Sequence, residues 1–204
     1  MKRLLLVRHG ETDWNYEHRL QGQQDLPLNE TGIQQVELLA SHLAAEPFDA
    51  AYSSDLDRAY ETARIINQHH DLVIRKDERL REIAFGKYEG LTYKDIQSRY
   101  PQEYSTWIND HSVATHGGET VGQLGARVGA LLTQIEADTH TQTVLIVGHG
   151  GPLRMLIALA LRMSPDKYWR FRMGNTSVSE VQANQKNWVL TRLNDQTHLS
   201  EPAV

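Results

Sequence analysis

Two short apolar segments with the same ending constrain the fold of this chain most. Leu4-Leu5-Leu6-Val7-Arg8-His9-Gly10 and Val144-Leu145-Ile146-Val147-Gly148-His149-Gly150 each hold an apolar run of buried-strand length, followed by a histidine and a glycine. If both strands lie side by side in a parallel sheet, both imidazoles emerge at its carboxyl edge, where ligands bind in open α/β folds. The alternative is that each glycine only turns the chain and each histidine is satisfied by local hydrogen bonds.

The rest of the chain alternates between predicted strands and helices, which indicates an α/β, three-layer sandwich with a mostly parallel sheet and helices on both faces. Further strands are predicted at 48–53, 72–74, 177–181 and 188–193, with a turn at 183–187, and a polar loop at 15–27. Helices are predicted from 29–32 to before 47, from 54 or 55 through 66, over 120–138 and over 151–161. Residues 79–118 break this rhythm, so we expect one domain, 1–204, with a helical insertion there that lies over the active site.

Composition excludes several classes of function. The chain has 204 residues, a net charge of -5 and no cysteine, so we expect no affinity for nucleic acid or acidic membranes and no thiolate site. The apolar run at the start ends at Arg8, too soon to target or span a membrane. We therefore expect a cytoplasmic protein, either a monomer or a homodimer.

Several motifs, in order along the chain, closely resemble those of the histidine phosphatase superfamily, also called phosphoglycerate-mutase-like. They are Leu6-Val7-Arg8-His9-Gly10-Glu11-Thr12 with Asn15, Gln21-Gly22, Leu28-Asn29-Glu30-Thr31-Gly32, Ser53-Ser54-Asp55-Leu56-Asp57-Arg58-Ala59 and Gly148-His149-Gly150-Gly151. The resemblance implies a phosphate pocket at the carboxyl edge of the sheet, a small phosphorylated substrate, and no metal or organic cofactor. Two histidines alone also suit a metal hydrolase, but no third ligand stands at recognisable spacing near either.

The resemblance also implies a role for each site residue. A neutral imidazole can attack phosphorus, so His9 is the expected nucleophile, while Arg8, Arg58 and His149 stabilise the phosphoryl oxygens. Glu82 is the expected general acid, which must hold a proton at neutral pH; Glu89 is expected to be structural. The expected phosphate-binding residues are Arg8, Asn15, Gln21, Gly22, Arg58, His149 and Gly150. The alternative for Arg58 is an exposed helical ion pair with Asp55 or Glu61, and for Glu82 a solvated ion pair.

The insertion and the end of the chain decide the expected reaction. Ile83 to Thr92 and Asn175 to Asp195 resemble the phosphatase branch, in particular broad-specificity and α-ribazole-phosphate phosphatases. We therefore expect hydrolysis of small phosphate monoesters through a phosphohistidine, with α-ribazole phosphate as one candidate substrate. The alternatives are phosphoglycerate mutase-type phosphoryl transfer and a catalytically silent phosphate-binding module.

The sequence leaves substrate specificity open. The insertion's aromatic residues either line the pocket or form the insertion's own core, which we favour; they are Tyr88, Tyr93, Tyr100, Tyr104 and Trp107. Glu119 is expected in the first turn of a helix near the pocket, and the amides of Gly117 and Gly118 could approach the phosphate. The other histidines, at 18, 42, 69, 70, 111, 116, 140 and 198, are expected on the surface.

Overall fold

The computed structural model describes residues 2–110, 113–184 and 187–200, and their strands form one six-stranded sheet in the order β3-β2-β4-β1-β5-β6. The strands are β1 (Lys2–Arg8), β2 (Ala50–Ser53), β3 (Ile74–Lys76), β4 (Thr143–Gly148), β5 (Val178–Asn184) and β6 (Asn187–Asp195). The helices are α1 (Asp13–Tyr16), α2 (Glu30–Leu43), α3 (Asp57–Ile66), α4 (Tyr93–Arg99), α5 (Pro101–Asn109), α6 (Val121–Ala137) and α7 (Gly150–Ala160). Five 3-10 turns join them: η1 (Asn67–His69), η2 (Glu78–Leu80), η3 (Gly86–Tyr88), η4 (Pro165–Arg170) and η5 (Thr197–Leu199). The first four strands are parallel and β5 is antiparallel to β1, so the mostly parallel sheet is confirmed.

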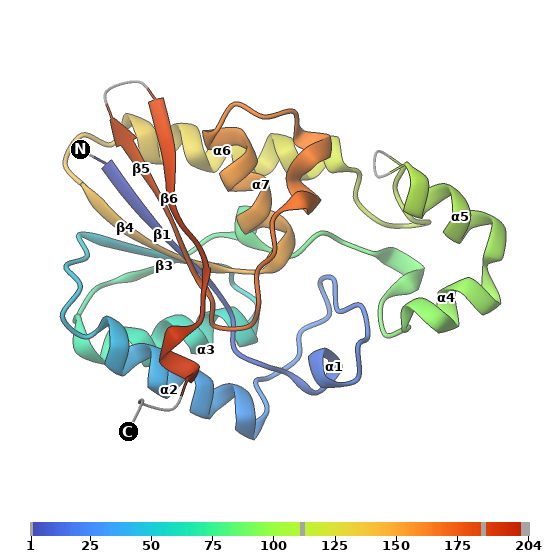
Figure 1. The fold of residues 1–204 in the computed structure, drawn as a ribbon, viewed down its shortest axis with the longest axis horizontal. Coiled ribbons are helices and arrows are strands. Elements are labelled where there is room, and N and C mark those ends of the chain that lie inside the picture. Colours follow the sequence, from blue (N-terminus) through green and yellow to red (C-terminus); the bar gives the residue numbers. More distant parts are fainter. Residues whose placement is uncertain (1, 111–112, 185–186, 201–204) are drawn as a thin grey trace.

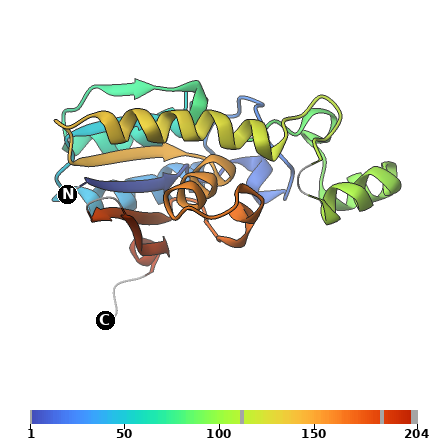
Figure 2. The same ribbon diagram turned by 90° about the horizontal axis from the view of Figure 1, so that it is seen from above.

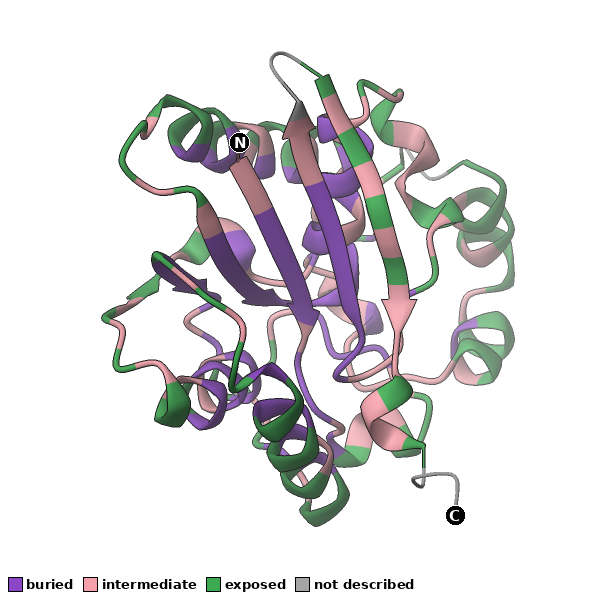
Figure 3. Cartoon of the chain, turned by 60° about the vertical axis from the view of Figure 1, so that its left-hand side comes forward, coloured by how far each residue is buried: buried purple, intermediate pink, exposed green. Residues whose placement is uncertain are grey.

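Helices cover both faces of the sheet, as predicted. Because successive side chains of a strand point to opposite faces, Leu4 and Leu6 of β1 pack with α6 and α7, whereas Leu5 and Val7 pack with α2 and α3. These helix pairs form the upper and lower layers in Figure 1. The central strands are buried along their apolar length, whereas edge strand β6 alternates between exposed and half-buried residues (Figure 3).

The predicted helical insertion contains η3, α4 and α5 and begins within η2. Figure 2 shows α4 and α5 beyond the sheet, on the side toward which β1 and β4 run. Leu20, Tyr88 and Ile96 form a small buried core there, separate from the two cores that flank the sheet. The insertion is thus held at the edge where both predicted histidines emerge.

Several local predictions were wrong or displaced. Neither Ser54 nor Asp55 caps α3, whose N-cap is Leu56 without a side-chain cap; Ser54 instead contacts His149, and Asp55 pairs with Arg81. The third strand begins at 74 rather than 72, because the Asn67 side chain holds both backbone groups of Leu72. The polar loop at 15–27 overlaps α1, which begins at 13. The predicted turn at 183–187 centres on 185–186, outside the described residues.

No helix among the described residues has the length and apolarity needed to cross a bilayer.

Candidate active site

The two predicted histidines meet at the carboxyl edge of the sheet. β1 and β4 pair in parallel, with Arg8 opposite Gly148, so the next residue on each strand is a histidine. Their ring centroids lie 5.0 Å apart, and His9 and His149 are only 2% and 0% exposed. The parallel pairing therefore brings both imidazoles together at this edge, as predicted.

One nitrogen of His9 is held by the backbone. Its Nδ1 lies 2.7 Å from the carbonyl oxygen of Gly10, which accepts a hydrogen bond only if Nδ1 carries the proton. Asn175 fixes this segment by donating to the carbonyls of His9 and Gly10 at 3.0 and 3.1 Å. The Nε2 of His9 is therefore the nitrogen with a free lone pair.

Two arginines bring positive charge into the site without a carboxylate partner among the described residues. Arg8 donates to the carbonyl of Met173 at 2.7 Å. The fully buried Arg58 donates to the carbonyls of Gln24 at 2.6 Å and Gly22 at 2.8 Å. The Nε atoms of both arginines are buried and make no hydrogen bond with the described residues. Neutral carbonyls orient these guanidinium groups without cancelling their charge, so the site suits an anion.

Burial changes the protonation of this cluster. It lowers the pKa of both Arg8 and Arg58 to about 10, so both remain charged at neutral pH. Burial, followed by the charge of Arg58, places the pKa values of His9 and His149 well below their ordinary range. His149 lies 2.9 Å from the hydroxyl of Ser54 through Nε2, and its Nδ1 has no partner among the described residues. The site therefore presents two neutral imidazoles beside the guanidinium cations of Arg8 and Arg58.

We expect both site histidines to remain neutral in the free protein as the pH falls through 6.5. Long-range proton–nitrogen NMR spectra of the imidazoles measure this directly. Because the folded-state pKa values lie below the unfolded value of about 6.5, protonation favours the unfolded chain. The free energy of unfolding should then fall as the pH drops below that value, by up to about 1.4 kcal/mol per pH unit for each ring. Titration of either ring at or above pH 6.5 would contradict this picture.

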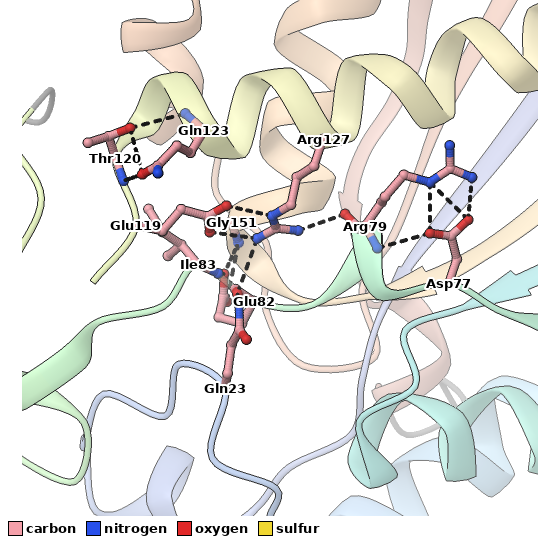
Figure 4. Close-up of polar contacts among 10 residues, drawn as sticks. All are labelled: Gln23, Asp77, Arg79, Glu82, Ile83, Glu119, Thr120, Gln123, Arg127 and Gly151. Carbon is pink, nitrogen blue, oxygen red and sulfur yellow. Dashed lines mark hydrogen bonds and ion pairs between the residues drawn. The ribbon is translucent and has the colours of Figure 1, made fainter. Parts of the chain in front are cut away.

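Backbone donors and a half-buried arginine hold Glu82 in place (Figure 4). Its Oε1 accepts hydrogen bonds from the amides of Ile83 at 2.8 Å and Gly151 at 2.9 Å. Arg127, on α6, donates to the Glu82 carbonyl at 3.2 Å and forms an ion pair with Glu119 at 2.7 Å. Gln23 also donates to the Glu82 carbonyl at 3.2 Å. Glu82 is thus a positioned pocket residue and not a solvated ion pair.

The pocket at this edge has a volume of about 300 Å³. The predicted site residues that line it are Arg8, His9, Asn15, Gln21, Arg58 and Glu82. The Oδ1 of Asn15 accepts from the Thr12 amide, as part of the N-terminal cap of α1, and from Asn175. The NH₂ group of Asn15 makes no hydrogen bond with the described residues, so it can donate to a group in the pocket.

Three predicted binding residues are not among those that line the pocket. His149 packs against the ring of His9, Gly22 supplies a carbonyl to Arg58, and Gly150 begins α7. The neighbouring Gly151 is the lining residue. The strand pattern correctly predicted the turn after β4, but it does not show which residue of that turn faces the pocket.

The insertion contributes both lining and core. Tyr93 and Trp107 line the pocket, and their rings stack 6.0 Å apart. The expectation of a separate aromatic core is confirmed for Tyr88, which is 1% exposed, and Tyr100 and Tyr104 pack against it. Glu89 is structural, as predicted, because it accepts from the amides of Gln23 at 3.1 Å and Phe85 at 3.0 Å.

The glycine pair before α6 does not serve the pocket, contrary to the prediction. Neither glycine lines it. The amide of Gly118 donates to the carbonyl of Thr115 at 2.8 Å, and Gly117 has a positive φ of 73° beside Gly86. A side chain at Gly118 would collide with Thr115, so close packing explains that glycine.

Most of the remaining histidines lie on the surface, as predicted. His70 and His198 are half-buried, His111 lies outside the described residues, and the others are exposed. No group of three or more potential metal-ligating side chains occurs within the described ranges.

The sequence prediction missed Arg154 and Tyr168, both of which line the pocket. Arg154 follows Gly150 by one helical turn, a spacing that places it on the same face of α7 as the turn after His149. That spacing could have identified Arg154 as a pocket residue from the sequence. Tyr168 lies in η4 and carries no comparable sequence pattern.

Comparisons with known proteins agree with this geometry. A family model described as the histidine phosphatase superfamily (branch 1) matches residues 4–196. The chain is 35% identical to phosphoserine phosphatase 1 of Hydrogenobacter thermophilus, over 98% of this chain and 96% of that protein. It is also 35% identical to probable phosphoglycerate mutase GpmB of Yersinia pestis, over 100% and 98% of the two chains. The crystal structure of the alpha-ribazole phosphatase from Shigella flexneri superposes with a TM-score of 0.89 at 33% identity, over 95% and 96% of the two chains.

Proposed function

Because the chain belongs to the histidine phosphatase superfamily, we propose that it hydrolyses small-molecule phosphate monoesters through a phosphohistidine at His9. The observation that carries this proposal is the arrangement around that imidazole. Its Nδ1 is anchored on the Gly10 carbonyl, and its free Nε2 belongs to a pocket lined by Arg8 and Arg58. A neutral nucleophile among fixed cations suits attack on a phosphate dianion.

The first half of the proposed reaction phosphorylates the enzyme. The Nε2 lone pair of His9 forms a bond to phosphorus while the bond from phosphorus to the alcohol oxygen breaks. Glu82 gives its proton to that oxygen, so the leaving group departs as a neutral alcohol. Arg8 and Arg58 stabilise the charge on the phosphoryl oxygens, and His149, neutral in the free site, gains a proton more easily beside the dianion.

The second half releases phosphate. Glu82, now a carboxylate, removes a proton from water as the water oxygen attacks phosphorus and the bond from Nε2 to phosphorus breaks. Because Oε1 of Glu82 already accepts two backbone hydrogen bonds, we assign the transferred proton to Oε2. Each residue then returns to its starting state.

A phosphoglycerate mutase-type transfer is the second candidate, and the similarity to GpmB favours it. In that reaction the phosphoryl group returns from His9 to a second hydroxyl of the substrate instead of to water. Both candidates require the same nucleophile and differ only in the acceptor. The cytoplasm is the proposed location, since charged phosphate esters do not cross bilayers unaided.

A panel of phosphate esters, assayed with a metal chelator present, tests the proposed function. We expect release of inorganic phosphate from several small alkyl esters at the same rate with and without chelator. The panel includes 3-phosphoglycerate, whose conversion to 2-phosphoglycerate with little phosphate release would favour the mutase. A large loss of rate in chelator that zinc or magnesium restores would contradict the covalent scheme.

A further inference from the structure

A third arginine of the pocket has no role in the proposed reaction. Arg154 lies on α7, and its Nη2 approaches Gly150 so closely that a Cβ added there would be 2.8 Å away. The absence of a side chain at Gly150 thus leaves room for the guanidinium group. Arg154 lines the pocket and lies near enough to Arg8 for its charge to lower the pKa of Arg8.

Arg154 has no ion-pair partner among the residues that the structure describes. Its Nε is buried and makes no hydrogen bond with them. The pocket carboxylate of Glu119 is not available, because it binds Arg127 through two contacts of 2.7 and 2.8 Å. The carboxyl group of Glu82 is held by the backbone amides of Ile83 and Gly151 and forms no ion pair with Arg154. A buried guanidinium donor without a protein acceptor indicates a ligand acceptor.

Tyr168 adds a neutral donor to the same part of the pocket. It lines the pocket, and its hydroxyl forms no hydrogen bond with any residue in the described ranges. Burial raises the pKa of Tyr168 to about 12, with Arg154 acting in the opposite direction, so the hydroxyl keeps its proton at neutral pH. Arg154 and Tyr168 together offer a guanidinium fork and a hydroxyl donor.

We propose that Arg154 and Tyr168 bind a carboxylate of the substrate, so that the preferred substrates are small phosphate monoesters that carry a carboxylate. This inference rests on the proposed function, in which Arg8 and Arg58 bind the phosphoryl group. A carboxylate fits the two parallel N–H donors of one guanidinium group. A second phosphate would call for several cations, and a pocket of about 300 Å³ restricts the ester to a small one.

The test compares O-phosphoserine with O-phosphoethanolamine, two esters that differ only by the carboxylate. Neither has a second hydroxyl, so mutase chemistry cannot affect the comparison. We expect kcat/KM of the native protein to be about tenfold or more higher for O-phosphoserine than for O-phosphoethanolamine. One charge-assisted hydrogen-bonded pair between the carboxylate and Arg154 is enough for a difference of this size. Arg154→Gln should bring this ratio close to one, and Arg154→Lys, which keeps the charge but not the fork, should give an intermediate ratio.

Arg64→Gln is the matched control, because Arg64 forms a surface pair with Glu61 on α3; the ratio should not change.

A ratio near one in the native protein would contradict the carboxylate site. So would an Arg154→Gln variant in which both esters lose activity equally, since Arg154 would then act on the transferred phosphate. If O-phosphoethanolamine and p-nitrophenyl phosphate are hydrolysed without any preference for the carboxylate, only this inference fails. If no ester is hydrolysed, the proposed function fails and this inference fails with it.

Discussion

Replacing His9 with alanine is expected to reduce the hydrolysis of every phosphate monoester by at least about 10⁴-fold. The variant lacks the Nε2 of His9, which belongs to the pocket and keeps a free lone pair because Nδ1 donates to the Gly10 carbonyl. Neighbouring His149 should not replace it, because its Nε2 contacts Ser54 and it does not line the pocket. Steady-state assays with alkyl and aryl esters measure the loss.

Two further variants separate chemistry from folding. His9 is only 2% exposed, so alanine also removes packing volume; His9→Gln restores most of that volume and should be equally inactive. His140→Ala changes an exposed histidine and should keep full activity. An active His9→Ala protein, or a loss of activity that disappears in His9→Gln, would remove His9 from the mechanism.

Replacing Glu82 with glutamine is expected to lower kcat for alkyl esters by about 10²- to 10⁴-fold with little change in substrate binding. The amide oxygen can still accept from Ile83 and Gly151, so the loop should keep its position. The phosphorylation step should be far less affected with p-nitrophenyl phosphate, because nitrophenolate leaves without a proton. Burst kinetics with both esters measure this difference.

Glu78→Gln is the control for Glu82, since Glu78 lies nearby in the chain with a side chain that is 75% exposed. Its kinetics should match those of the native protein. If Glu82→Gln slows the phosphorylation step equally for alkyl and aryl esters, the carboxyl does not protonate the leaving group. Unchanged turnover would exclude it from the reaction altogether.

The sequence predicted those parts of the fold and site that follow from short-range patterns. The pairing of β4 with β1 follows from two apolar runs that each end in a histidine and a glycine. This pairing brings His9 and His149 together. The helical position of Arg58 did not predict its burial, because an arginine on a helix is usually exposed. It depends on the carbonyls of Gly22 and Gln24, which a distant loop brings to α3.

The remaining errors have the same origin. Ser54 resembles a helix cap by position, but tertiary contact with His149 takes precedence over a local role. Gly118 resembles a phosphate-binding glycine, but its amide is used by Thr115. The position of Arg154, one helical turn after Gly150 on α7, could have indicated that it faces the pocket. Only the folded chain shows that no carboxylate among the described residues pairs with it. Contacts between distant segments decided each of these positions.

Direct detection of the phosphorylated enzyme tests the central claim. The native protein and the Glu82→Gln variant are mixed with p-nitrophenyl phosphate, quenched in base within the first turnover, and digested for mass spectrometry. We predict that residue 9 is the phosphorylated position in both proteins. The phosphorylated fraction should be larger in the variant, because Glu82 is also needed to activate the water that removes the phosphoryl group. A phosphoryl group on another residue, or active turnover without any phosphorylated peptide, would contradict the account.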